Sequence, residues 1–233
     1  MTLIKLDKIY KTYKDGELLV PVLKNISFEI EKGEFVTIMG PSGSGKSTLL
    51  NIIGCLDQPT EGSYYLDDIL IKDQKDKELS RIRNNFIGFV FQNFHLLSHL
   101  KAYENVELPM IYNGIFEKER RPKAKEALEK VGLSDRMNHK PAQLSGGEKQ
   151  RVAVARSIAM GPDLILADEA TGALDSVAGD NIMEIFKTLN ETFGMTIIQV
   201  THSKAIALKS QKIIHILDGK INRIEYVKEG EIL

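Results

Sequence analysis

The chain has 233 residues, of which 42% are hydrophobic and 27% are charged, and this length is enough for a single globular domain, residues 1–233, with a large core. The formal net charge of −1 excludes an overall positive field that would hold nucleic acid, so nucleic acid is not expected as a partner. The single cysteine, Cys55, excludes an internal disulfide and is expected to be a small buried apolar residue in a reducing compartment.

The first elements are predicted to be two antiparallel strands that precede a central sheet. Met1–Asp7 lacks the apolar core of a signal peptide, and no uncharged run is long enough for a membrane span, so we expect no direct membrane insertion. Leu3–Tyr10 alternates imperfectly, and Val20–Ile30 is a second β-rich run. Between them lies Tyr13, whose ring could hold adenine by stacking or simply pack against the protein. Its position alone leaves both roles open.

A glycine-rich loop follows, and it is the strongest signal in the sequence. The loop matches the G-x-x-x-x-G-K-[ST] pattern, with the sequence Gly40-Pro41-Ser42-Gly43-Ser44-Gly45-Lys46-Ser47. It lies between the apolar run Phe35–Met39 and the helical run Leu49–Leu56. Glycines let the backbone bend round a phosphate with its N–H groups pointing inward, and a helix N-terminus adds donors and partial positive charge. Lys46 supplies a full charge for the outer phosphates, and the Ser47 hydroxyl is placed to bind Mg²⁺. The residues expected to bind nucleotide here are Gly40, Ser42, Gly43, Ser44, Gly45, Lys46, Ser47 and Thr48.

The segment after this loop is predicted to form a hairpin, a helix and a buried strand in turn. Tyr64–Ile71 is typical of a hairpin, Lys77–Arg83 of a helix, and Phe86–Phe91 of a buried strand that stops at Gln92. At the carboxyl end of a strand in an α/β sheet, the amide oxygen of Gln92 could bind a metal or a water molecule. Capping of the strand by the same amide is an equally open alternative.

From about Glu104 to Met160 the sequence is helical in character, with no strand signal. Four apolar residues recur at helical spacing with charges between them: Ala124, Ala127, Leu128 and Val131. The pattern predicts a helical insertion into the α/β core.

Within that region, Leu144-Ser145-Gly146-Gly147-Glu148 indicates a second glycine-flanked helix N-terminus. Ser145 and Glu148 form the S-x-x-E capping-box pattern. Two glycines just after a cap weaken the helix by roughly 1 kcal/mol each, but they let a ligand approach its free N–H groups. We therefore expect a second anion site. An ordinary capped helix would explain Ser145 and Glu148, but not the paired glycines.

Two acidic residues end the next buried strand. The run Leu164–Ala167 is short, continuous and apolar, as in a parallel strand buried on both faces, and Asp168 and Glu169 follow it. Carboxylates at this end of a strand face the ligand crevice of an open α/β sheet. Asp168 suits coordination of Mg²⁺, through water, and Glu169 suits the polarisation of a water that attacks a γ-phosphate.

The remaining elements are predicted to be a helix, a core strand and a closing hairpin. An amphipathic helix contains Ile182–Leu189, and Thr196–Val200 is the next core strand, with His202 just beyond it. An imidazole there could bond a γ-phosphate, or be a structural residue at the end of a strand. Lys212–Val227 is typical of a hairpin with a turn at Asp218-Gly219.

The chain resembles the ATPase subunit of an ABC transporter from about Leu3 to Tyr226. The resemblance rests on five features taken together and in this order: the phosphate-loop pattern, Gln92, LSGGE, Asp168-Glu169 and His202. Further segments resemble its MacB/LolD-type branch: Ile38–Asp57, Ile87–Gln92, Glu104–Pro109 and Thr171–Ser176. The resemblance implies an α/β P-loop NTPase fold with a RecA-like parallel-sheet core and an antiparallel β subdomain, residues 1–92 and 161–233. The signature motif would lie in a helical subdomain at about residues 93–160.

The resemblance also implies roles for these residues, with ATP and Mg²⁺ as cofactors. Tyr13 would stack on adenine, and Gln92 would link the metal to a membrane permease. The implied catalytic residues are Lys46, Gln92, Glu169 and His202, and the implied metal-binding residues are Ser47, Gln92 and Asp168. Ala170 stands where the family usually has proline, which removes a fixed φ but no chemical group.

Finally, the resemblance implies partners and a location. Two copies would form a head-to-tail homodimer, in which Ser145 and Gly147 of one subunit close over ATP held by Gly43–Thr48 of the other. The partner would be an FtsX/MacB-like integral-membrane permease, with this chain peripheral on the cytoplasmic face of the plasma membrane. An alternative is an FtsE-like mechanical ATPase that regulates a membrane partner without transport.

Overall fold

Five short strands, most of whose residues are buried, run parallel at the centre of the molecule. The structure is a computed structural model that describes residues 1–228 and 230–233. Its strands are β1 (Thr2–Asp15), β2 (Leu18–Glu31), β3 (Phe35–Met39), β4 (Glu61–Leu66), β5 (Ile69–Leu70), β6 (Ile87–Phe91), β7 (Leu164–Asp168), β8 (Thr196–Thr201), β9 (Lys212–Leu217), β10 (Lys220–Lys228) and β11 (Glu231–Ile232). Its helices are α1 (Lys46–Ile53), α2 (Asp76–Phe86), α3 (Ala102–Tyr112), α4 (Glu117–Lys130), α5 (Gly146–Ile158), α6 (Ser176–Phe193) and α7 (Lys204–Ala207).

The central sheet has the strand order β11-β10-β9-β3-β8-β7-β6, and β9, β3, β8, β7 and β6 are mutually parallel. Parallel strands covered on both faces consist mostly of apolar residues, which is why their sequences lack a clean alternation. The register pairs Phe91 with Asp168 and Met39 with Thr201. The loops that follow these strands therefore leave the sheet at one edge. This arrangement confirms the predicted α/β class and the parallel core.

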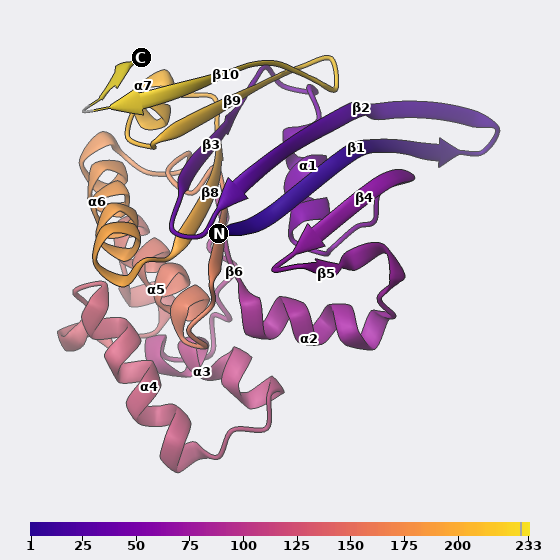
Figure 1. Cartoon of the computed structure of the whole chain (residues 1–233). Coiled ribbons are helices and arrows are strands. Elements are labelled where there is room, and N and C mark those ends of the chain that lie inside the picture. The colour runs from indigo at the N-terminus through magenta and orange to yellow at the C-terminus, as the bar shows by residue number, and fades with distance from the viewer. Residues whose placement is uncertain (229) are drawn as a thin grey trace.

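A second, antiparallel sheet of order β2-β1-β4-β5 packs beside the first. Its long β1–β2 hairpin projects from the body as an arm, on the right of Figure 1. The pairing of β1 with β2 shifts register near Lys8, where the backbone φ is 50°, and β2 has a matching φ of 59° at Asn25. These irregularities break the alternation of both strands. The sequence predicts both strands but makes them too short: Leu3–Tyr10 is only part of β1, and Val20–Ile30 is only part of β2.

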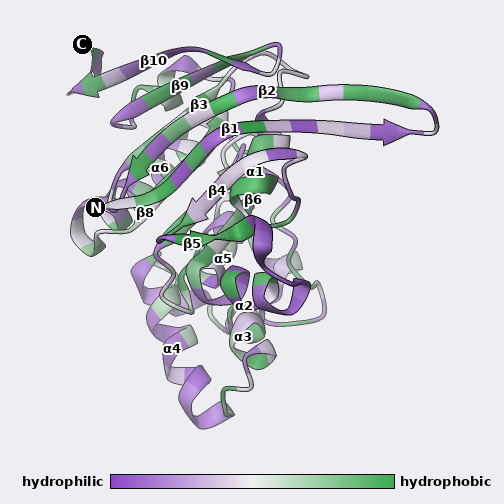
Figure 2. Ribbon diagram, turned by 45° about the vertical axis from the view of Figure 1, so that its right-hand side comes forward, coloured by the Kyte–Doolittle hydropathy of each residue, from purple (hydrophilic) through white to green (hydrophobic). Residues whose placement is uncertain are grey.

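Two apolar clusters lie on opposite faces of the central sheet. One cluster joins α1 and the antiparallel sheet to Leu164 and Leu166, while the other joins α3, α4, α5 and α6 to Ile165 and Ala167. Successive residues of β7 thus face opposite clusters, as the strand geometry requires. Figure 2 shows the apolar residues gathered where these layers meet, whereas α4, at the edge of the molecule, is mostly hydrophilic.

The helical region is as predicted. The structure describes every residue from 93 to 163, and this stretch contains α3, α4 and α5 but no strand. A buried carboxylate, Glu107 on α3, accepts hydrogen bonds from Arg120 Nε at 3.1 Å and Arg121 Nε at 2.5 Å, both on α4. This pair of contacts fixes α3 against α4.

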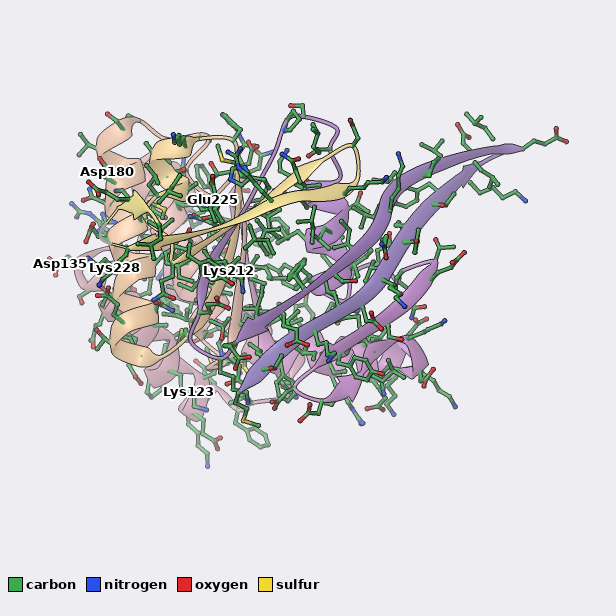
Figure 3. The ribbon with its side chains drawn as sticks, turned by 45° about the horizontal axis from the view of Figure 1, so that its top comes forward. Lys123, Asp135, Asp180, Lys212, Glu225 and Lys228 are labelled. Atoms are coloured by element: carbon green, nitrogen blue, oxygen red, sulfur yellow. The ribbon has the colours of Figure 1, made fainter. Side chains whose placement is uncertain are left out.

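The C-terminal hairpin closes the sheet, and its Asp218-Gly219 turn has positive φ at both residues, as the sequence predicts. Figure 3 labels Lys212 on β9 and Glu225 on β10. The buried Lys212 ammonium donates to the carbonyl of Glu29 at 2.9 Å and lies 3.1 Å from Glu34 Oε1. It therefore ties the central sheet to the end of β2.

Candidate functional site

The phosphate loop, Gly40–Ser47, joins the buried strand β3 to α1 at the carboxyl edge of the sheet. Gly43 and Gly45 have φ values of 77° and 101°, which side-chain-bearing residues rarely adopt. Gly45 is the N-cap of α1 and offers no side-chain acceptor to the first turn. The N–H groups at the start of α1 are therefore left without a side-chain cap, as an anion site requires.

Two of the glycines are also required by close packing. A Cβ atom on Gly40 would lie 2.2 Å from the carbonyl oxygen of Ile216, and one on Gly45 would lie 2.8 Å from Leu23 Cδ2. Nothing lies within 4 Å of the same position on Gly43. Gly40 thus anchors the loop to β9, whereas Gly43 serves only the backbone turn.

The polar side chains of the loop have unused hydrogen-bonding capacity. Lys46 is buried, and its Nζ donates to the carbonyl of Pro41 at 2.8 Å, which leaves further N–H donors on the ammonium. Ser44 Oγ is buried and has no hydrogen-bond partner among the described residues. Buried polar atoms are normally paired, so this one needs an external group. Ser42 and Ser47 are exposed, and Thr48 is half-buried. These donors fit the oxygens of a polyphosphate.

Asp168, Glu169 and His202 lie together at the ends of β7 and β8. The Glu169 Oε1 and His202 Nδ1 atoms are 3.2 Å apart. Glu169 has a φ of 47°, a left-handed conformation that is uncommon for a residue with a side chain. Burial raises the pKa of Asp168, the charge of Glu169 raises it further, and Lys46 opposes both. Two carboxylates beside a single lysine leave an excess of negative charge that a cation would balance, and Asp168 and Ser47 offer oxygens of the type that Mg²⁺ prefers.

Gln92 follows β6 directly, and its side chain lies over the loop after Glu169. A Cβ atom on Gly172 would lie only 2.9 Å from Gln92 Nε2. The structure thus brings Gln92 to the same edge as Asp168 and Glu169, as the sequence predicts from strand ends alone.

Gln150, on α5, is a residue of this site that the sequence does not single out. Its side chain is fully buried, and its Nε2 donates to the carbonyls of Phe91, at 3.2 Å, and Ala170, at 2.7 Å. It therefore connects α5 to the chain on either side of the site. Gln150 lies three and four residues before Ala153 and Val154, on the same face of the helix, and this spacing is the signal that could have identified it as buried.

The serine-glycine turn, Ser145–Glu148, forms the predicted capping box at the start of α5. Ser145 Oγ accepts from the Glu148 N–H at 3.2 Å, and Glu148 Oε2 accepts from the Ser145 N–H at 2.8 Å. The Ser145 N–H, with help from Arg136, lowers the pKa of Glu148 despite partial burial. The cap is therefore charged and firmly held.

The glycines of this turn have a packing role in addition to the one expected. A Cβ atom on Gly147 would lie 3.1 Å from Ala178 Cβ on α6, and one on Gly146 would lie 3.5 Å from Leu174 Cδ2. Glycine lets the start of α5 approach α6 closely. The paired glycines are therefore explained in part by a contact within the chain.

The serine-glycine turn and the phosphate loop belong to different hollows. One hollow of about 290 Å³ is lined by Ser145–Glu148, Arg151 and residues from 173 to 182, and no residue of the phosphate loop lines it. A neighbouring hollow of about 410 Å³ is lined by Glu169, His202 and residues from 171 to 180. The loop around Asp175 borders both. The two expected anion sites are thus separate surfaces of the same chain.

Tyr13 lies on the arm, at the side of α1. The residue is 40% exposed, its hydroxyl donates to Asp57 Oδ2 at 2.8 Å, and Lys11 Nζ lies 4.8 Å from the ring centre. Burial and the bond to Asp57 raise the pKa of Tyr13, and Thr48 acts in the opposite direction. An exposed aromatic face therefore lies close to the first turn of the phosphate-loop helix.

Several known proteins are similar to this chain in sequence. A model of the ABC transporter family matches residues 23–172. The chain is 55% identical over 219 residues to the uncharacterized ABC transporter ATP-binding protein YvrO of Bacillus subtilis, a match that covers 94% of this chain and 95% of YvrO. It is 51% identical over 221 residues to the macrolide export ATP-binding/permease protein MacB of Aggregatibacter actinomycetemcomitans, a match that covers 95% of this chain and 34% of MacB.

The structure also has a close counterpart among solved structures. The ATP-binding cassette MJ0796 of Methanocaldococcus jannaschii was solved as a dimer in a post-hydrolysis state bound to ADP and Pi. It matches this structure with a TM-score of 0.87 at 51% identity, over 97% of this chain and 99% of that chain. The fold is therefore that of an ATP-binding cassette.

Proposed function

The chain belongs to the ABC transporter family, as an ATP-binding ATPase domain. From this premise we propose that two copies close head-to-tail on two ATP molecules to drive a separate membrane permease. The observation that supports the dimer is the separation of the two helix N-termini. No residue of the phosphate loop lines the hollow of the serine-glycine turn, and Gly40 and Pro41 of the loop line a different hollow. Each helix N-terminus is thus a separate anion site of one chain, and a two-fold arrangement would bring one site of each kind to the same triphosphate. The dimer of MJ0796, 51% identical, supports this arrangement.

In this proposal the chain's own residues divide the work. The loop N–H groups and Lys46 bind the phosphates, with Ser42, Gly43 and Thr48 around them. Ser47, Asp168 and Gln92 would hold Mg²⁺, which would supply positive charge to the outer phosphate oxygens when bound.

Glu169 would accept the proton of the attacking water, and His202, 3.2 Å away, would hold that carboxylate and the γ-phosphate in place. Tyr13 would stack on adenine. Ser145 and Gly147 of the second copy would cover the outer phosphates. Contacts made only in the closed pair favour closure while ATP is intact, and the pair would open after hydrolysis.

A groove beside β6, the strand that precedes Gln92, is suited to a membrane permease. It has a volume of about 820 Å³ and lies among α2, β6, α3 and α5. Its lining consists mainly of apolar and aromatic residues with four basic side chains, and it includes no carboxylate: Leu56, Phe89, Phe91, Leu108, Tyr112, Met160, Lys77, Arg81, Arg83 and Arg156. An amphipathic cytoplasmic segment with carboxylates would complement this groove.

Arg156 connects the groove to the ATP site. Its guanidinium, which is half-buried, donates to the carbonyls of Phe94, at 2.9 Å, and His95, at 2.7 Å, just after Gln92. Burial lowers the pKa of Arg156. A permease that docks in the groove would contact Arg156, which holds the segment that follows Gln92, and movement would pass between the two through this side chain.

The permease would be a different chain. Among the described residues, which exclude only position 229, there is no helix of the length and apolarity that a bilayer crossing needs. MacB, by its name, unites an ATP-binding part and a permease in one protein. We place this chain at the cytoplasmic face of the membrane, bound to such a partner, and its match to the ABC transporter family supports this placement. Its likeness to a macrolide exporter supports transport over mechanical regulation without cargo.

The test is ATP turnover by the purified chain, together with capture of a multi-span membrane protein from its own membranes. The double variant K77E/R81E reverses two charges at the groove rim and should reduce capture at least about tenfold without changing basal turnover. K123E on α4 is the control, because Lys123 is an exposed charge outside the groove (Figure 3). Absence of ATP turnover, or equal capture by all three proteins, would contradict the proposal.

A further inference from the structure

Asp57 lies four residues beyond the end of α1, where it reaches β1. Its Oδ1 accepts from Lys11 Nζ at 2.5 Å and from the Gln58 N–H at 2.7 Å, and its Oδ2 accepts from the Tyr13 hydroxyl at 2.8 Å. Both oxygens of one carboxylate are therefore committed to holding the arm. Burial acts to raise the pKa of Asp57, but the hydrogen bonds from Lys11, Tyr13 and the Gln58 N–H outweigh it and lower that pKa. The carboxylate is thus ionised at neutral pH.

The turn that contains Asp57 is bonded to successive residues of β1. Gln58 O accepts from Lys11 Nζ at 2.8 Å, the Thr60 N–H donates to Tyr10 O at 2.8 Å, and the Thr12 N–H donates to Thr60 Oγ1 at 3.0 Å. The arm projects from the body beyond this point, with α1 beneath it in Figure 1. These bonds therefore fix the base of a projecting hairpin to the end of the phosphate-loop helix.

The contacts also determine which part of Tyr13 can receive a ligand. The hydroxyl is held by Asp57, and the ammonium of Lys11 lies over the ring, 4.8 Å from its centre. One face of the ring is thus occupied by a cation. Because Tyr13 is 40% exposed, we take the opposite face as the one that stacks, and the ring cannot rotate away without breaking its bond to Asp57.

We propose that Asp57 is a positioning residue for nucleotide binding, which holds the ring of Tyr13 at a fixed distance from the phosphate loop. The helix α1 begins at Lys46, in the phosphate cradle, and the turn after it ends at Asp57. A single rigid element therefore sets the spacing between the site for the phosphates and the site for the base. This inference rests on the proposed function, in which Tyr13 stacks on adenine.

The test compares D57A, D57N and the control E29A in binding ATP and in binding inorganic tripolyphosphate, which has no base. D57A should weaken ATP binding roughly 3- to 10-fold, a part of the full stacking contribution. Its kcat and its affinity for tripolyphosphate should not change. D57N keeps an acceptor for the Tyr13 hydroxyl and should recover part of the loss. E29A removes an exposed β2 carboxylate that pairs with Lys5 at 2.9 Å, far from the ring, and should behave as wild type.

Two results would overturn the inference. One is an ATP affinity of D57A equal to that of E29A. The other is an equal loss of tripolyphosphate binding, which would mean that the substitution damages the phosphate loop. Y13A separates this inference from its premise. If Y13A weakens ATP binding and D57A does not, only the role of Asp57 is wrong; if neither variant does, the stacking of adenine on Tyr13 is wrong as well.

Discussion

Replacing Ser145 tests the lid role of the serine-glycine turn without disturbing the fold. Asparagine, aspartate and serine are about equally good N-cap residues, so S145D and S145N both keep the start of α5. Ser145 is exposed, and its hydroxyl bonds only to the Glu148 N–H, at 3.2 Å, which either side chain can replace. We expect the stability of both variants to lie within about 0.5 kcal/mol of the wild type.

The two variants differ in the charge that they present to the partner's ATP. A carboxylate about 4 Å from a phosphate oxygen is repelled by about 4 kcal/mol at an effective dielectric constant of 20. This corresponds to about 10²- to 10³-fold in the closed state. S145D should therefore lose ATP turnover by about that factor, while S145N, which is similar in shape but neutral, should lose less than about tenfold.

The assay is steady-state ATP hydrolysis, with a thermal melt of each variant and a direct measurement of ATP binding to the monomer. ATP binding to the isolated cradle should be the same for both variants, because Ser145 lies outside the hollow that borders the phosphate loop. Equal turnover by S145D and wild type would refute the assignment of this turn as a lid. Equal, severe loss in both variants would show that the effect is not electrostatic.

Three further changes test separate parts of the structure. K46A removes the only side-chain cation of the phosphate loop and should weaken ATP binding by about 10²-fold or more, as measured by calorimetry; unchanged affinity would contradict the cradle. E107A leaves Arg120 and Arg121 without their buried carboxylate. Because both arginines are partly exposed, we expect the free energy of unfolding to fall by about 2–3 kcal/mol, which lowers Tm by roughly 4–12 °C. A fall in Tm of less than about 2 °C would refute this. Burial raises the pKa of Cys55 to about 12, so its thiol is neutral at pH 8 and should react with a thiol reagent only as fast as the protein unfolds; rapid labelling of the folded protein would contradict its burial.

The positions of the site residues are predictable from sequence because of the sheet. Each parallel strand is a short apolar run, and the polar residue that ends it marks the carboxyl edge. Gln92, Asp168 and His202 are located in this way, although they are far apart in the chain. Their meeting at one edge follows from parallel pairing alone.

Contacts between side chains on different elements are not predictable in this way. The bonds of Gln150 to the carbonyls of Phe91 and Ala170 depend on how α5 packs, and the bond of Asp57 to Tyr13 depends on where the arm crosses α1. The packing of Gly147 against Ala178 is of the same kind. A periodic pattern indicates which face of an element is buried, but it does not specify which partner that face meets.

The ends of β1 and β2 also cannot be predicted from the sequence pattern. The outer part of the arm has water on more than one side, so its residues have little reason to alternate; Leu18 and Leu19, for example, are 65% and 63% exposed. The strands persist there because each supplies the backbone hydrogen bonds of the other, from Tyr13 paired with Val20 to Asp15 paired with Leu18.

The most direct test of the shared ATP site is the mass of E169Q in solution, measured by light scattering with and without ATP. Glutamine removes the general base and should slow hydrolysis by about 10²- to 10⁴-fold while leaving ATP bound. The account predicts a mass of 26.1 kDa without nucleotide and about twice that with ATP, and a return to the lower mass when S145D is added to the same chain. An E169Q protein that binds ATP tightly and yet keeps the mass of one chain would contradict it.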